Sequence, residues 1–120
     1  MPAGKENAEQ RYDDAAYAYS EGRFEEALAG FSDLAESGNA IAATYMAEMY
    51  LRGEGVSPDV EKGLDLLRRA ASLGHSTAAF NLGALYRTGG CGVQKDLEKS
   101  KKFFLLAKEL GCELPVEEYL

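Results

Sequence analysis

Few side chains in this sequence have the types and spacing that catalysis or metal binding requires. His75 is the only histidine, so any Ser/His/Asp or Cys/His set would have to include it, and no such set stands out. A zinc site would need further histidines or cysteines at ligand spacing, which His75 lacks. We therefore expect a structural role for His75, and we expect no catalytic residue, metal or cofactor.

Two other patterns resemble functional motifs but lack the context that those motifs need. Asp13-Asp14 and Glu25-Glu26 are adjacent pairs of acids, and neighbouring positions on a helix point in different directions, so neither pair makes a catalytic dyad. The GEGV stretch at 53–56 follows a helical pattern rather than a strand, and no Gly-Lys-Ser/Thr comes after it. It is therefore read as a turn rather than a phosphate-binding loop.

The two cysteines, Cys91 and Cys112, flank a predicted helix. A helix of about 15 residues is ~22 Å long, whereas a disulfide needs about 6 Å between the two Cα atoms. We expect free thiols, which suit a reducing compartment. The first ten residues lack the apolar core of a signal peptide, and no apolar run approaches the length of a membrane span. These features predict a cytoplasmic protein.

The net charge of −7 is unevenly distributed. Residues 1–58 contain 11 acids and 4 bases, whereas residues 59–120 contain 9 of each. Nucleic acid and anionic membranes are bound by clustered lysine and arginine, so neither is expected as a partner. An acidic half suits a protein partner with a basic surface, drawn in by electrostatic steering. The alternative is that the acids only keep the chain in solution.

Much of the chain consists of one pattern written twice. Residues 43–75 align with residues 79–112, and Tyr50 and Tyr86 lie 36 positions apart. Gly74 and Gly111 lie 37 apart, because the second loop has one extra residue. Self-similarity at this period is typical of stacked helical units that cannot bury their apolar faces alone.

A third, less similar copy precedes these two. The first helix of each unit has a small residue three positions before a tyrosine, and we expect the three tyrosines to have like surroundings. The second helices share a triplet at i, i+4 and i+7, followed by glycine. The first-helix pairs are Ala16/Tyr19, Ala47/Tyr50 and Gly83/Tyr86, and the second-helix triplets begin at Ala27, Gly63 and Ser100.

The apolar spacing and the glycine stops predict six helices in one domain, 1–120. The fold class is all-α, a right-handed α/α solenoid of three helix-turn-helix repeats with a short C-terminal cap. The units are expected at 6–38, 40–74 and 76–111, and the cap at 112–120. In the cap, Val116, Tyr119 and Leu120 are expected to cover the end of the stack. The helices are expected at 6–20, 23–37, 40–52, 59–73, 76–88 and 96–110.

Residues 82–111, with their degenerate copy at 46–75, resemble the Sel-1-like repeat, a longer-looped relative of the tetratricopeptide repeat. The G-x-G-V loop with its aspartate and the closing A-x-x-L-G carry this resemblance. The first hairpin lacks that loop and is closer to a tetratricopeptide unit. Gly63 stands where the family usually has alanine, which weakens its helix by about 1 kcal/mol unless close packing needs glycine.

The resemblance implies a non-catalytic adaptor that holds its partner on the concave face, which the first helix of each pair lines. On those helices, an exposed set of Tyr17, Leu51 and Phe80 beside acids would anchor a basic, partly apolar partner. Alternatively, Leu51 and Phe80 pack between repeats and the acids are solvated. The candidate partner-binding residues are Asp13, Tyr17, Glu21, Thr44, Glu48, Leu51, Arg52, Phe80 and Arg87.

Small members of this family also occur beside bacterial toxin genes as candidate immunity proteins. The sharpest functional hypothesis is therefore an immunity or inhibitor protein that binds a basic toxin such as a nuclease. A general scaffold or signalling adaptor, self-associating through an uncapped end, is the main alternative. A third is an enzyme acting on β-lactam or cell-wall substrates, an activity sometimes attributed to relatives, which would require export.

Overall fold

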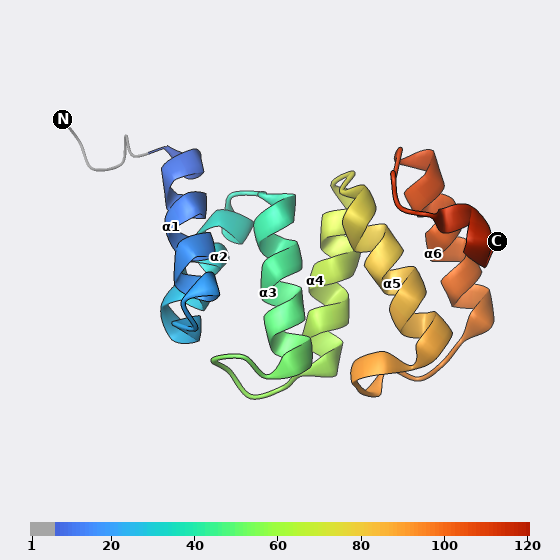
Figure 1. Cartoon of the computed structure of the whole chain (residues 1–120), viewed down its shortest axis with the longest axis horizontal. Helices are drawn as coiled ribbons and strands as arrows, with labels where there is room; N and C mark the ends of the chain where they lie inside the picture. The colour runs from blue at the N-terminus through green and yellow to red at the C-terminus, as the bar shows by residue number, and fades with distance from the viewer. Residues whose placement is uncertain (1–6) are drawn as a thin grey trace.

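The computed structural model describes residues 7–120 and is an elongated row of six α-helices, 50 × 30 × 21 Å in extent (Figure 1). Each helix is 13 residues long. The predicted helix start at residue 6 and the interpretation of residues 1–6 lie outside the described residues. The helices are α1 (Ala8–Ser20), α2 (Phe24–Glu36), α3 (Ala40–Arg52), α4 (Val60–Ser72), α5 (Ser76–Thr88) and α6 (Leu97–Glu109), with 3₁₀ turns η2 (Gly90–Gly92) and η3 (Val116–Tyr119).

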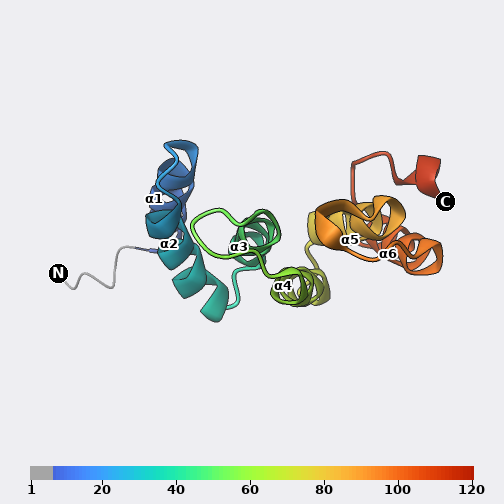
Figure 2. The ribbon, with the colours of Figure 1, turned by 90° about the horizontal axis from the view of Figure 1, so that it is seen from below.

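The helices form three antiparallel hairpins that lie side by side along the row (Figure 1). Seen from below, α1, α3 and α5 lie towards one side, and α2, α4 and α6 towards the other (Figure 2). Residues 7–120 contain no β-strand. The prediction of an all-α solenoid of three hairpins is therefore confirmed for the part of the chain that the structure describes.

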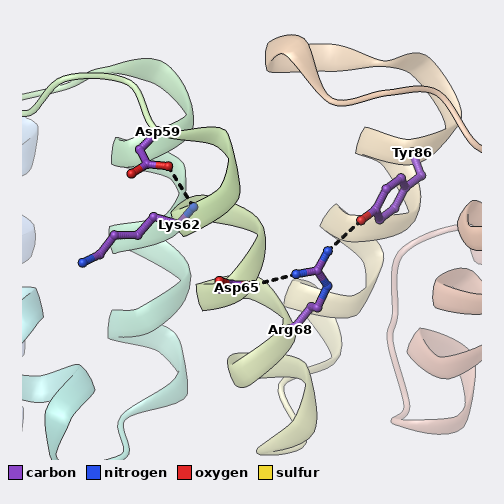
Figure 3. Close-up of polar contacts among 5 residues, drawn as sticks. All are labelled: Asp59, Lys62, Asp65, Arg68 and Tyr86. Atoms are coloured by element: carbon purple, nitrogen blue, oxygen red, sulfur yellow. Dashed lines mark hydrogen bonds and ion pairs between the residues drawn. The ribbon is translucent and has the colours of Figure 1, made fainter.

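Four of the helices begin at an asparagine or aspartate that caps the first turn. The Asp59 carboxylate accepts a hydrogen bond from the Lys62 backbone N–H at 3.0 Å (Figure 3), and Asp96 does the same for α6 at 3.1 Å. Such caps satisfy backbone donors that the helix leaves without partners. For α5 the N-cap position is held by His75, whose side chain makes no capping hydrogen bond, and Ser76 is the first residue of the helix. The other two capping residues are Asn7 and Asn39.

The three second helices end in the same way, one repeat after another. Each is followed by a glycine with φ of +95°, +95° or +85°, a conformation that a side chain would strain. The residue after each glycine donates its backbone N–H to a carbonyl five positions earlier, which satisfies a helix end. These bonds are Asn39 to Leu34 (3.0 Å), His75 to Ala70 (3.1 Å) and Cys112 to Ala107 (2.9 Å).

Close approach between the two helices of a hairpin explains two glycines inside helices. A Cβ on Gly63 would lie 2.7 Å from Leu51 Cγ and 3.1 Å from the Ala47 carbonyl oxygen. A Cβ on Gly83 would lie 2.9 Å from three atoms of the Phe104 ring. Glycine at 63 is therefore a packing requirement, and its helix-weakening effect is offset by burial of Leu51.

The prediction that three tyrosines have like surroundings is confirmed for Tyr50 and Tyr86 but wrong for Tyr19. A lysine ammonium lies over each ring, Lys62 at 5.2 Å and Lys99 at 5.4 Å. The backbone carbonyl of each tyrosine accepts a hydrogen bond from the N-cap aspartate of the following helix, at 2.9 and 2.8 Å. Tyr19 differs: its hydroxyl donates to Glu54 at 2.8 Å, because the first hairpin has no long loop of its own and receives the one from unit two.

Tyr86 also links two units. The Arg68 guanidinium on α4 donates to the Tyr86 hydroxyl on α5 at 3.0 Å and to the Asp65 carboxylate at 2.7 Å (Figure 3). This hydrogen bond joins α4 of the second hairpin to α5 of the third. It therefore helps to fix how the third hairpin packs on the second.

Candidate functional site

A groove lies on the side of the first helices. Its volume is about 510 Å³, within the range of about 300–1,000 Å³ typical of binding pockets. It is lined by residues of α1, α3 and α5, with His75 just before α5. These residues are Tyr12, Tyr19, Ile41, Thr44, Tyr45, Glu48, Arg52, His75, Thr77 and Asn81.

One wall of the groove is a cluster of aromatic rings around Tyr45. The Tyr45 ring stacks on Phe31 of α2, with centroids 4.7 Å apart and planes 7° apart. Tyr12 and Tyr19 meet the same ring edge-on, at 6.0 and 5.8 Å. Stacked and edge-on pairs are the favourable arrangements of aromatic rings, so this wall is rigid and preformed.

The floor of the groove is polar, and its groups bind one another. Glu48 forms an ion pair with Arg52 at 2.9 Å through one carboxylate oxygen. Its other oxygen accepts a hydrogen bond from the Asn81 side chain at 3.3 Å, which joins α3 to α5. The Thr44 hydroxyl donates to the Ala40 carbonyl at 2.9 Å. Each Glu48 oxygen thus has one partner and, because a carboxylate oxygen carries two lone pairs, can accept one more hydrogen bond.

Burial and neighbours shift four pKa values around the groove. Burial, with the neighbouring Tyr45 hydroxyl, raises the pKa of Tyr12 to about 12. Burial and the Glu54 carboxylate raise the pKa of Tyr19. Burial alone would lower the pKa of Arg52, but the charges of Glu48 and Glu54 and the neighbouring Tyr19 hydroxyl together outweigh it and raise the pKa. Burial lowers the pKa of His75, because the charged imidazolium loses solvation.

The structure brings three of the predicted site residues together: Thr44, Glu48 and Arg52 all line the groove. The three predicted on α1 lie elsewhere. Asp13, Tyr17 and Glu21 are exposed, and none is among the lining residues. The Tyr17 ring is 61% exposed, and the Arg23 guanidinium lies 5.6 Å from its centroid. They lie on the exposed side of α1, outside the groove, and this side is called the rim below.

The prediction that Leu51 and Phe80 are exposed anchors was wrong. Leu51 is only 5% exposed, because it packs over Gly63. Phe80 is half-buried, with its ring 5.2 Å from Phe104 and 6.1 Å from Tyr119. The exposed Arg87 lies over the same Tyr119 ring at 4.8 Å. Both side chains are packed against other elements, but of their own unit and the C-terminal turn rather than between repeats as the alternative expected: Leu51 against α4, and Phe80 against α6 and η3.

Sequence reasoning missed most of the residues that shape the groove. Tyr19 was expected only as one of three tyrosines with like surroundings, and His75 only in a structural role. Tyr45 and Asn81 went unnoticed, although a signal for them exists. Each stands two positions before the small residue of its unit, so the two occupy equivalent places on α3 and α5. The remaining unpredicted residues are Tyr12, Ile41 and Thr77.

Within residues 7–120 no group of three or more His, Cys, Asp and Glu side chains is arranged to hold a metal ion. None of the helices in that range combines the length and the apolar character that crossing a bilayer needs. Both cysteines are free, Cys91 exposed and Cys112 half-buried, as their predicted separation requires.

The family model of the Sel1 repeat matches this chain twice, at residues 40–75 and 76–112. The two matches coincide with the α3–α4 and α5–α6 hairpins, each with its long loop and closing glycine. The α1–α2 hairpin, whose connection is short, lies outside both matches.

Solved structures and a curated relative agree with this match. A Sel1 repeat protein from Oxalobacter formigenes superposes with a TM-score of 0.75 at 28% identity, covering 92% of this chain and 46% of that one. The protein c5321, a protective antigen of uropathogenic Escherichia coli strains with the SLR fold, superposes with a TM-score of 0.83 at 26% identity, covering 98% and 26%. Chitin synthase regulatory factor 1 of Schizosaccharomyces pombe is 39% identical over 71 residues. This match covers 58% of the chain and only 15% of that relative.

Proposed function

Because the chain belongs to the Sel1 repeat family, whose members are generally non-catalytic protein-interaction modules, we propose that its inner groove binds a segment of a protein partner. The observation that carries this proposal is the preformed groove across α1, α3 and α5, with a rigid aromatic wall and a polar floor. Aromatic anchors at the centre of a contact surface contribute most of the binding energy in protein complexes.

The distribution of charge favours a partner with a basic surface. The groove lies largely in the half of the chain that contains 11 acids and 4 bases. On its rim, Asp13, Tyr17 and Glu21 are exposed and available for contact. In the groove, Thr44, Glu48 and Arg52 would face the partner. Leu51 and Phe80 are left out of this surface because other side chains cover them, while the exposed Arg87 would lie at its far end.

The sharpest form of the proposal is an immunity or inhibitor protein that masks a basic toxin in the cytoplasm. The acidic half would take the place of the phosphates that a nuclease normally binds. The two free thiols suit a reducing compartment such as the cytoplasm. Steered association of this kind is fast and weakens as salt is added.

A general adaptor is the second candidate. It is favoured by the curated relative, which is named as a regulatory factor of chitin synthase and contains a stretch 39% identical to this chain. An adaptor of this type would use the same groove, but its binding would depend less on salt. Hydrolysis of a β-lactam or of cell-wall fragments by the purified chain would contradict both candidates.

The test compares two variants with the same change in charge. Asp13→Lys with Glu21→Lys alters the rim of the groove, and Glu98→Lys with Glu109→Lys alters exposed positions on α6. Wild type and both variants would be used to capture partners from the source cell, and the captured protein would then be purified for binding kinetics. We expect the rim variant to lose at least tenfold in association rate and the α6 variant to keep the wild-type rate.

Raising the salt concentration should lower the wild-type association rate but change the rim variant much less. Equal rates for all three proteins, or a rate that does not change with salt, would contradict the basic-partner proposal. A partner that both variants capture with wild-type kinetics at every salt concentration would instead support the adaptor.

A further inference from the structure

Equivalent phenylalanines of the first and third units are covered in the same way. Phe31 on α2 and Phe104 on α6 occupy the same position of the repeat, and both are fully buried. The Tyr45 ring stacks on Phe31 at 4.7 Å with planes 7° apart. The Tyr119 ring stacks on Phe104 at 4.7 Å with planes 18° apart. In both units an aromatic ring that comes after the hairpin covers its second helix.

The two covering tyrosines come from different elements. Tyr45 belongs to α3, the first helix of the next unit, whereas Tyr119 belongs to η3, since no further helix follows α6 within the described residues. Figure 2 shows η3 on the side of the row where α1, α3 and α5 lie. The turn therefore supplies the aromatic ring that a following repeat would have supplied.

The middle unit has no such ring. Asn81 occupies on α5 the position that Tyr45 occupies on α3. The Asn81 side-chain amide donates a hydrogen bond to the Glu48 carboxylate, with the nitrogen and oxygen 3.3 Å apart. The equivalent of Phe31 and Phe104 in this unit is Leu67, which is fully buried, so the unit offers no ring of its own. Asn81 and the Tyr45 cluster both line the groove of about 510 Å³, which leaves space where the other units have a covering tyrosine.

We propose that the groove accepts an aromatic side chain from the partner, beside Asn81 and against the Tyr45 ring, and so completes the series that Tyr45 and Tyr119 begin. This inference rests on the proposed function and names the anchor that the partner would contribute. The residue that fits is tyrosine or tryptophan.

Two features of the groove select that residue. Phe31 covers one face of the Tyr45 ring, and Tyr12 and Tyr19 meet its edge, so an entering ring finds aromatic neighbours that it can meet stacked or edge-on. Glu48 lies on the floor as an acceptor, which favours a ring that carries an O–H or N–H donor. The acidic rim favours lysine or arginine on either side of the aromatic residue.

Binding can be measured directly with short peptides. The probe is N-acetyl-Lys-Tyr-Lys-amide, and the matched control is N-acetyl-Lys-Ser-Lys-amide, which has the same charge and no ring. His75 is the only histidine and lines the groove, so its imidazole proton signals report on occupancy without ambiguity. We expect saturable shifts of these signals with the tyrosine peptide and at least tenfold weaker binding of the serine peptide.

Two substitutions at one position separate filling of the groove from loss of a hydrogen bond. Asn81→Tyr places a ring where the partner's ring would enter, and should weaken binding of the tyrosine peptide at least tenfold. Asn81→Ala removes the bond to Glu48 but leaves the space, and should weaken binding of the tyrosine peptide less than Asn81→Tyr does. If Asn81→Tyr does not fold, p-cresol provides a second test, because it should displace the tyrosine peptide from wild type whereas cyclohexanol should not.

Equal binding of the tyrosine and serine peptides would overturn the proposal, as would unchanged binding in a folded Asn81→Tyr variant. The two proposals can fail separately. If the peptides do not distinguish aromatic from serine but partner capture depends on the rim, the proposed function stands and the aromatic anchor fails. If the tyrosine peptide binds as expected but no partner depends on the groove, the reverse holds.

Discussion

The inner face of the row, formed by the first helix of each hairpin, is open at one end and covered at the other. In the first two units the face is open, and Tyr12, Tyr19 and Tyr45 form the wall of a groove. In the third unit the face is closed, because Tyr119 lies on Phe80 and Phe104. The helices all have the same length, although the first hairpin has the shorter connection, and the faces differ in a few side chains and a four-residue turn.

This comparison shows that the scaffold and the binding surface are specified by different residues. The scaffold depends on buried small residues, closing glycines and capping acids, which recur in the repeats. The surface depends on positions where the repeats differ, such as Tyr45 against Asn81. A repeat protein can therefore be stable everywhere and bind at one place only.

The largest effect should come from removing the phenylalanine under either covering ring. Phe31→Ala and Phe104→Ala each delete a fully buried ring, and each should cost about 3–5 kcal/mol of unfolding free energy. Only Phe31→Ala also removes the support of the Tyr45 ring, so only this variant should lose binding of the tyrosine peptide. Urea unfolding and peptide titration would check both points, and equal loss of binding in the two variants would break the comparison.

Removing the ring that closes the third unit should have an intermediate effect. Tyr119→Ala loses the contacts with Phe80 and Phe104 and the position of Arg87 above the ring, and should cost about 1–2 kcal/mol. The exposed Glu118→Ala is the matched control in the same turn and should change little. Urea midpoints would show the difference, and a Tyr119→Ala variant as stable as wild type would mean that η3 is not a cap.

Gly63 and Ser100 occupy the same position in units two and three but meet different neighbours. Gly63→Ala forces a Cβ against Leu51 and the Ala47 carbonyl, and should cost about 1 kcal/mol net, since overpacking outweighs the gain in helix propensity. Ser100→Ala removes a buried 2.8 Å bond to the Gly83 carbonyl and should also cost about 1 kcal/mol. Thermal unfolding would measure both, and stabilisation by Gly63→Ala would show that the close approach is not required.

The smallest effect concerns pH. Burial lowers the pKa of His75, so the unfolded chain binds more protons than the folded one just below pH 6.5. Stability from this group is present above that pH and is lost as the pH falls through the window between the unfolded and folded values. His75→Gln should flatten this part of the profile, measured as urea midpoints at pH 7.5 and 5.5. The same slope in both proteins would contradict the assignment.

Most of the fold was predictable because the residues next to a helix end determine where the helix stops or starts. Closing glycines such as Gly74 and capping acids such as Asp59 placed the described helix ends within one or two residues of the observed ones. The groove was less predictable, because it depends on which face of a helix points inward. Leu51 was assigned to the wrong face, since its burial depends on the absence of a side chain at Gly63, on another helix.

The uneven charge has a consequence that the total of −7 conceals. In physiological salt, electrostatic forces fade over about 8 Å, whereas the molecule is 50 Å long. An approaching protein therefore senses only the end that it meets. Towards α1 and α2 the chain behaves as a strong polyanion, and towards α6 as a nearly neutral body, so net charge alone would underestimate its attraction for a cationic surface.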